Sequence, residues 1–108
     1  MNKPVEITDA NFKKEVLESH VPVLLDVWAD WCMPCRMVAP AVEAVAQQYA
    51  GKVKVGKMDA DNNLMPGQFG IRGIPTLLLF RGGKVVDRIV GAVPQQVLAS
   101  HIDKVLLN

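Results

Sequence analysis

The stretch VLLDVWADWCMPC, residues 23–35, decides how the chain folds. Its first half belongs to a near-continuous run of Val and Leu over residues 21–29, which is typical of a strand covered on both faces. Directly afterwards, apolar residues recur every three or four positions over residues 32–50, which predicts a long amphipathic helix. The sequence therefore predicts a buried strand that leads into a helix, with two cysteines at the junction.

The rest of the chain alternates between further strand and helix patterns. Four short apolar segments are expected to be strands: residues 5–8, 53–59, 76–80 and 85–90. A short helix is expected after the first of them, residues 61–69 form an irregular, partly helical segment, and Pro94 opens a last helix. Strands that alternate with helices predict an α/β sheet covered on both faces. The RGGK turn at residues 81–84 adds an antiparallel hairpin, so the sheet is mixed.

Composition and charge narrow the classes of function. The 108 residues suit one domain, residues 1–108, and half of them are hydrophobic, so a core needs no metal or disulfide. The net charge is +1 and the basic residues are scattered, which argues against a nucleic-acid surface or a basic membrane-binding helix. No apolar run reaches the roughly 20 residues of a membrane span, and residues 1–6 contain no signal-peptide pattern. We therefore expect a soluble protein of a reducing compartment, the cytoplasm.

The chain contains two cysteines, Cys32 and Cys35, at the start of the predicted long helix. Residues three apart at a helix start share one face and are close enough to form a disulfide. The positive end of the helix dipole stabilises a thiolate by about 0.3–2 kcal/mol. Because the thiolate is the species that carries out thiol–disulfide exchange, Cys32 is predicted to attack disulfides. Cys35 lies one turn further in, is expected to be more shielded, and would resolve the mixed disulfide.

Other interpretations of the cysteine pair stay open at this point. Half of a zinc site would need further ligands, and the only other soft candidates are His20 and His101, which lie in separate segments. Two inert core cysteines are also compatible with the pattern, whereas a purely structural disulfide is not expected in a reducing compartment. We expect no metal and no bound cofactor.

Two charged residues interrupt the apolar strand patterns. Asp26 lies inside a covered strand, where a carboxylate is costly unless it is paired or protonated, and burial would raise its pKa. We predict that Asp26 exchanges a proton with Cys35; the alternative is a carboxylate satisfied by backbone donors or exposed at a sheet edge. Alternation places Lys57 on the face of Val53 and Val55, where it would modulate Asp26, unless its ammonium simply reaches solvent.

Taken together, the motifs closely resemble those of the thioredoxin family. They cover almost the whole chain: WADWC at residues 28–32, PC at 34–35, AP at 39–40, GIRGIPTL at 70–77, and the single residues Asp26, Met37, Lys57, Asp59 and Gly91. The resemblance implies the thioredoxin fold, an α/β architecture with a central five-stranded mixed sheet in the order 1-3-2-4-5 and four flanking helices. It also implies protein-disulfide reduction, with Cys32 as the attacking thiolate and Cys35 as the resolving thiol.

The resemblance further implies roles for the residues around the pair. Asp26 would accept and donate the proton of Cys35 with Lys57 beside it, and Pro75 would be a cis-proline opposite the disulfide. A groove for an extended substrate segment would be lined by Trp31, Met33, Pro34, Gly73, Ile74, Pro75, Gly91 and Ala92. The implied partners are protein disulfide substrates and an NADPH-dependent thioredoxin reductase, whose flavin this chain does not bind. We expect the protein to be a monomer.

One position departs from the family pattern. The family usually has Gly where this chain has Met33, which adds an apolar, uncharged side chain at the exposed rim. We expect a modest electrostatic effect and retained reductase character, since Pro34 is kept, unlike in strongly oxidising relatives with His at that position. Two other functions stay open: a disulfide oxidase or isomerase on the same fold, and a non-catalytic binding module or accessory subunit.

Overall fold

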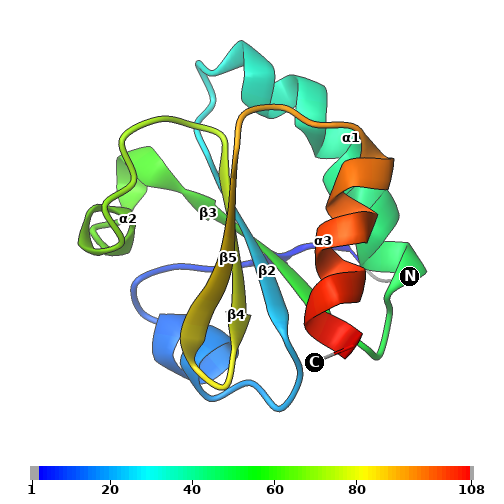
Figure 1. Ribbon diagram of the computed structural model, residues 1–108. Helices are drawn as coiled ribbons and strands as arrows, with labels where there is room; N and C mark the ends of the chain where they lie inside the picture. The colour runs from blue at the N-terminus through cyan, green and yellow to red at the C-terminus, as the bar shows by residue number, and fades with distance from the viewer. Residues whose placement is uncertain (1–2, 108) are drawn as a thin grey trace.

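The computed structural model describes residues 3–107, and Figure 1 shows how their strands and helices are arranged. The strands are β1 (Val5–Glu6), β2 (Val23–Trp28), β3 (Lys54–Asp59), β4 (Thr76–Arg81) and β5 (Lys84–Val90). The helical segments are η1 (Lys13–Leu17), α1 (Met33–Gln48), η2 (Ala60–Asn62), α2 (Met65–Gln68) and α3 (Gln95–Leu107). Residues 1–2 and 108 lie outside the described residues. The two ends of the expected 1–108 domain, and the first two residues of the segment 1–6 in which no signal-peptide pattern was expected, are therefore not described.

The sheet has the strand order β1-β3-β2-β4-β5. β1 and β2 both pair with β3 in parallel, whereas β4 is antiparallel to β2, and β5 is antiparallel to β4. The expected five-stranded mixed sheet and its order are therefore confirmed. The four expected helices are confirmed within residues 3–107 as η1, α1, α2 and α3, with η2 as an additional single turn of 3-10 helix.

Helices cover both faces of the sheet, with α1 and α3 on one face and η1 and α2 on the other (Figure 1). β2 lies at the centre, and its side chains alternate between two apolar cores. Leu24 faces α1 and α3, where it packs with Val38, Val42, Val45, Leu77, Leu79, Leu98 and Ile102. On the other face, three β2 residues and their neighbours form the second core: Val23, Leu25, Val27, Phe12, Val16, Met58, Leu78 and Phe80. Coverage of both faces explains why the β2 segment is almost continuously apolar.

The edge strand β1 is held against β3 at a glycine. The Ile7 amide donates to the Lys57 carbonyl at 2.8 Å, and the Ile7 side chain is fully buried over Gly56. A Cβ at Gly56 would lie 2.6 Å from Ile7 Cγ1, so only a residue without a side chain lets the two strands approach this closely. The close approach places Glu6 of β1 at the register position next to Lys57.

The long helix α1 begins and ends within two residues of the expected positions. Cys32 is its N-cap, Tyr49 its C-cap, and Gly51 adopts φ +81°, the left-handed conformation that terminates helices. The Tyr49 hydroxyl donates to the Asp103 carboxylate at 2.6 Å and thereby joins α1 to α3. Between residues 3 and 107, no helix has both the length and the apolar composition needed to cross a membrane.

Candidate active site

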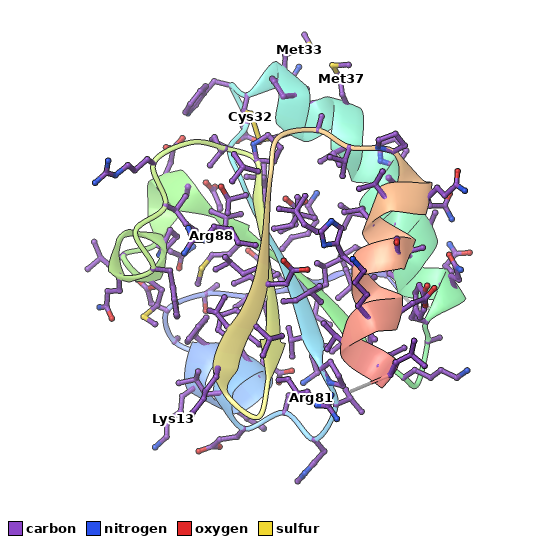
Figure 2. All side chains as sticks on the ribbon, viewed as in Figure 1. Lys13, Cys32, Met33, Met37, Arg81 and Arg88 are labelled. Carbon is purple, nitrogen blue, oxygen red and sulfur yellow. A yellow bond between two sulfur atoms is a disulfide. The ribbon has the colours of Figure 1, made fainter. Side chains whose placement is uncertain are left out.

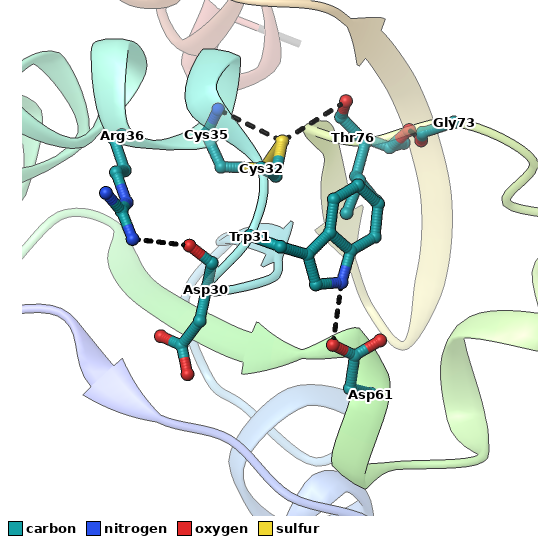
Figure 3. Close-up of a disulfide and its surroundings, with 9 residues drawn as sticks. Asp30, Trp31, Cys32, Cys35, Arg36, Asp61, Gly73 and Thr76 are labelled. Atoms are coloured by element: carbon teal, nitrogen blue, oxygen red, sulfur yellow. Dashed lines mark hydrogen bonds between the residues drawn. A yellow bond between two sulfur atoms is a disulfide. The ribbon is translucent and has the colours of Figure 1, made fainter.

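Cys32 and Cys35 form a disulfide at the N-terminal end of α1 (Figure 3). Their Cα atoms are 5.3 Å apart, because three residues at a helix start bring the two side chains onto one face. The Cys35 amide donates to Cys32 Sγ at 3.2 Å, so this sulfur serves as the acceptor of the helix cap. A sulfur in this position faces the positive end of the helix dipole, which favours the thiolate in the reduced protein.

Both cysteines are packed against neighbours rather than free in solvent. Cys32 is 3% exposed and Cys35 is 4% exposed, and they form a small apolar cluster with Ala29, Trp28 and Ile74. The expectation that Cys35 is the more shielded of the two is therefore wrong for the disulfide form. The reason is that the strand end and the Ile74 loop cover Cys32 as fully as the helix covers Cys35. The two cysteines differ in their position on the helix: Cys32 is the N-cap residue, whereas Cys35 lies in the first turn.

The loop opposite the disulfide contains the cis peptide bond Ile74–Pro75, as the resemblance implied. The Ile74 carbonyl oxygen lies 3.6 Å from Cys32 Sγ, and the Pro75 carbonyl accepts a hydrogen bond from the Gly91 amide at 2.9 Å. The Thr76 hydroxyl donates to the Gly73 carbonyl at 2.6 Å and fixes the entry of the loop. These contacts bring the loop and the segment after β5 together beside the reactive sulfurs.

The rim of the site is formed by exposed apolar side chains. Trp31, Met33 and Met37 are 70%, 62% and 68% exposed. Figure 2 shows Met33 and Met37 at the same end of the molecule as Cys32, both pointing outward from the start of α1. The Trp31 indole nitrogen donates to Asp61 Oδ2 at 2.8 Å, which holds the ring in place although most of it faces solvent (Figure 3). Other residues expected in the groove, Pro34, Gly73 and Ala92, are exposed as well.

Asp26 is completely buried in the middle of β2. Burial raises the pKa of its carboxyl from 3.8 to about 6, while the positive charge of Lys57 acts in the opposite direction. Neither carboxylate oxygen has a hydrogen-bond partner among the described residues, so the alternatives of a carboxylate satisfied by backbone donors or exposed at an edge are both wrong. A carboxyl that titrates near neutral pH is suited to proton transfer.

Lys57 occupies the register position of β3 next to Asp26, on the face that alternation predicted. Its side chain is half-buried, and its ammonium nitrogen lies 4.8 Å from the centre of the Trp28 ring. Such a cation–π contact holds a charge near an aromatic face without removing it from solvent. The positive charge of Lys57 acts on the buried carboxyl of Asp26 and lowers its pKa.

The zinc interpretation of the cysteine pair gains no further ligands. His101 Nδ1 lies 2.6 Å from Asp87 Oδ2, where α3 packs near β5, and His20 is exposed. Within residues 3–107, no three His, Cys, Asp or Glu side chains come together in a way that would hold a metal ion.

Two residues at the site were not selected from the sequence. Asp61 holds the Trp31 ring through a hydrogen bond between residues that are 30 positions apart in the sequence. No local sequence pattern predicts this contact, because it joins the start of α1 to η2. Met37 was noted only as part of the family pattern. Its spacing of four residues from Met33 on a predicted helix was a usable signal, because residues four apart share one helix face.

A disulfide between cysteines three residues apart, capping a helix and facing a cis-proline loop, defines a thiol–disulfide oxidoreductase. The comparisons with known proteins agree. The thioredoxin family model matches residues 3–104. The chain is 54% identical to thioredoxin 1 of Nostoc sp. over 96% of this chain and 98% of that protein. It is 54% identical to the thioredoxin of Synechocystis sp. over 98% and 100%, and 49% identical to that of Haemophilus influenzae over 96% and 98%.

The chain belongs to the thioredoxin family. Its family and its cysteine pair are those of a protein-disulfide reductase. The family as a whole acts on protein disulfides and is recycled by thioredoxin reductase.

Proposed function

We propose that this chain, as a single domain, reduces disulfides of other proteins by a two-step exchange in which each cysteine has one task. The Cys32 thiolate attacks one sulfur of the substrate disulfide; a Cys32–substrate disulfide forms, and the other substrate sulfur leaves as a thiolate that takes a proton from water. The Cys35 thiol then gives up its proton and its sulfur attacks Cys32 Sγ; the Cys32–Cys35 disulfide forms, and the second substrate sulfur leaves as a thiolate that takes up a proton. The substrate gains two electrons and two protons, and the protein is left oxidised.

The observation that carries this proposal is the position of Cys32 as the cap of α1, with its sulfur accepting from the Cys35 amide. The same interaction that closes the helix end stabilises negative charge on the attacking sulfur. It also fixes the distance to Cys35, so the second step is intramolecular and needs no further search for geometry.

Asp26 is the proposed proton acceptor for Cys35, with Lys57 modulating it. The thiol of Cys35 must lose its proton before it can attack the mixed disulfide. A buried carboxylate with a pKa of about 6, whose two oxygens have no hydrogen-bond partner among residues 3–107, is a suitable base at neutral pH, directly or through a water.

The proposed substrate groove is the set of rim and loop residues around the disulfide: Trp31, Met33, Pro34, Gly73, Ile74, Pro75, Gly91 and Ala92. Exposed apolar side chains next to the attacking sulfur would cover an extended substrate segment, and the loop backbone would bind it through hydrogen bonds. We further propose that the protein works as a monomer in the cytoplasm. There an NADPH-dependent thioredoxin reductase would return it to the dithiol form.

The test is insulin reduction followed by turbidity, with a recycling reductant present. The wild-type protein is expected to bring turbidity forward, Cys32→Ser to behave like the reductant alone, and Cys35→Ser to accumulate mixed disulfides seen by mass spectrometry. Full activity of Cys32→Ser would contradict the assignment of the attacking sulfur. Equilibration with glutathione completes the test, since a protein that is oxidised at a modest glutathione disulfide ratio would be an oxidase rather than a reductase.

A further inference from the structure

Three charged residues form a row across three neighbouring strands. Glu6 on β1 and Asp26 on β2 both stand at the register position of Lys57 on β3, one on each side. Side chains at matching positions of paired strands point to the same face of a sheet. The row therefore runs negative, positive, negative from the sheet edge to its centre. Solvent exposure decreases along the row: Glu6 is exposed, Lys57 is half-buried and Asp26 is fully buried.

A surface pocket of about 200 Å³ lies over the outer part of this row. It is lined by Pro4, Glu6, Trp28, Lys57 and Asp59. The Lys57 side chain lines this pocket, and its register position also places it next to the buried Asp26. Glu6 is the exposed carboxylate at the edge-strand wall of the pocket.

Asp59, the other acidic residue that lines this pocket, has its carboxylate oxygens hydrogen-bonded to neighbouring amide groups. Asp59 is two residues further along β3 on the same face, and its oxygens accept from the Asp61 amide at 2.9 Å and the Asn62 side-chain amide at 2.6 Å. Within residues 3–107, no ion pair shorter than 4 Å fixes Lys57 to either Glu6 or Asp26. Its ammonium rests against the Trp28 ring and forms an ion pair with neither of the two carboxylates.

We infer that Glu6 is a positioning residue that sets, through Lys57, how readily the buried Asp26 releases its proton. The carboxylate of Glu6 draws the ammonium toward the pocket mouth and so weakens the stabilisation that Lys57 gives to the ionised form of Asp26. The inference rests on the proposed function, in which Asp26 is the base for Cys35. It concerns a residue of the edge strand that touches neither cysteine nor substrate.

The expected size follows from the sheet geometry. Residues two strands apart are separated by about 9.6 Å, so the direct repulsion between the carboxylates amounts to about 0.3 pKa units even at the dielectric constant of water. Competition for the ammonium adds to this with the same sign. Removing the charge of Glu6 should therefore lower the pKa of Asp26 by about 0.4–0.6 units, roughly a 2.5- to fourfold change in its ionisation equilibrium.

The experiment is a pH titration of the Asp26 carboxyl carbon by NMR in the oxidised protein. Glu6→Gln is expected to shift the midpoint downward by about 0.4–0.6 units, and Glu6→Asp, which keeps the charge, to leave it near the wild-type value. Glu43→Gln makes the same change in net charge on the exposed side of α1 and is expected to leave the midpoint unchanged. In the Lys57→Met background, Glu6→Gln is expected to produce a clearly smaller shift, because only the direct repulsion remains.

Three results would overturn the inference: no shift in Glu6→Gln, an upward shift, or a downward shift that is as large without Lys57 as with it. Insulin reduction as a function of pH separates this inference from the proposed function. If Asp26 is the base, the acidic limb of the profile moves with the NMR midpoint in Glu6→Gln. A shifted midpoint with an unmoved limb would keep the coupling of Glu6 to Asp26 and reject Asp26 as the base.

Discussion

The two faces of β2 differ in a way that separates stability from chemistry. Val23, Leu25 and Val27 point toward η1 and α2 and are fully buried among apolar neighbours. Toward α1, the strand presents Leu24, then Asp26, whose buried carboxyl has no hydrogen-bond partner among residues 3–107, and then Trp28, a half-buried ring next to the cysteines. Because successive side chains alternate, one face of the strand is apolar throughout, whereas the other carries Leu24 in the α1–α3 core and then a titrating group. The comparison predicts that substitutions of Leu25 and of Asp26 have opposite effects on the free energy of unfolding.

The largest stability effect is expected on the apolar face. Leu25→Ala removes a side chain that is 1% exposed and leaves a cavity, so the free energy of unfolding should fall by about 2–5 kcal/mol. The redox equilibrium with glutathione should stay as in the wild type, since Leu25 faces away from the site. Leu107→Ala, at a position that is 84% exposed, is the matched control and should change stability by less than about 0.5 kcal/mol. Urea unfolding of the oxidised proteins measures both; equal losses would contradict the contrast.

The opposite effect is expected from Asp26 on the other face. Its pKa is raised from 3.8 to about 6 in the folded protein, so folding favours the protonated carboxyl. This contribution to stability is present below about pH 4 and is lost as the pH rises through about 6, by up to about 3 kcal/mol. Asp26→Asn cannot ionise, so the difference in unfolding free energy between variant and wild type should grow in favour of the variant from pH 4 to pH 7. A constant difference over this range would contradict the prediction, and the variant should reduce insulin more slowly.

An intermediate effect is expected where β1 meets β3. Gly56→Ala places a methyl group 2.6 Å from Ile7 Cγ1, so overpacking should reduce stability by about 1–3 kcal/mol. Ile7→Ala removes Cγ1 and should make the second substitution less costly, which a double-mutant cycle of unfolding free energies will show. Additive losses would mean that the two side chains do not meet. Thiol–disulfide exchange should be retained in the Gly56 and Ile7 single variants and in the double variant.

The smallest effect is expected at Met33, on the rim of the site. Its side chain is uncharged and 62% exposed, so Met33→Gly should change stability by less than about 1 kcal/mol. The glutathione equilibrium should move by less than tenfold, below about 30 mV. Met37→Gln, one turn along the same exposed face, serves as a comparison for loss of apolar surface alone. A larger redox change in Met33→Gly would show that this residue sets the potential of the pair.

Most of the fold could be predicted from the sequence because its decisive signals are local. The apolar run of β2, the helical period of α1 and the Gly-Gly turn before β5 each specify their own segment. The short η1 is π-helical, and nothing in its sparse apolar stripe distinguishes that from an α-helix. The strand order came from the resemblance, since lateral pairing depends on contacts between distant segments.

The site, too, was predictable where its features depend on local sequence, and not where they depend on contacts between distant segments. The disulfide and the burial of Asp26 follow from residue type and spacing along the chain. The hydrogen bond from Trp31 to Asp61 and the alignment of Glu6 with Lys57 required the folded structure, because each joins elements that only the tertiary fold brings together. The equal coverage of the two cysteines also depends on a loop 42 residues away in the chain from Cys32, the one that carries Ile74.

The double use of the Cys32 sulfur, as reactant and as helix cap, affects which inactive variants are informative. Serine retains an acceptor atom that a helix start favours, so α1 should remain closed and any lost turnover can be attributed to the missing sulfur. Alanine removes the acceptor as well, at a cost of about 0.5–2 kcal/mol, and would mix unravelling of the first turn with loss of chemistry. Serine at position 32 is therefore the appropriate replacement for studies of non-covalent substrate binding, whereas covalent trapping needs Cys32 in place, as in Cys35→Ser.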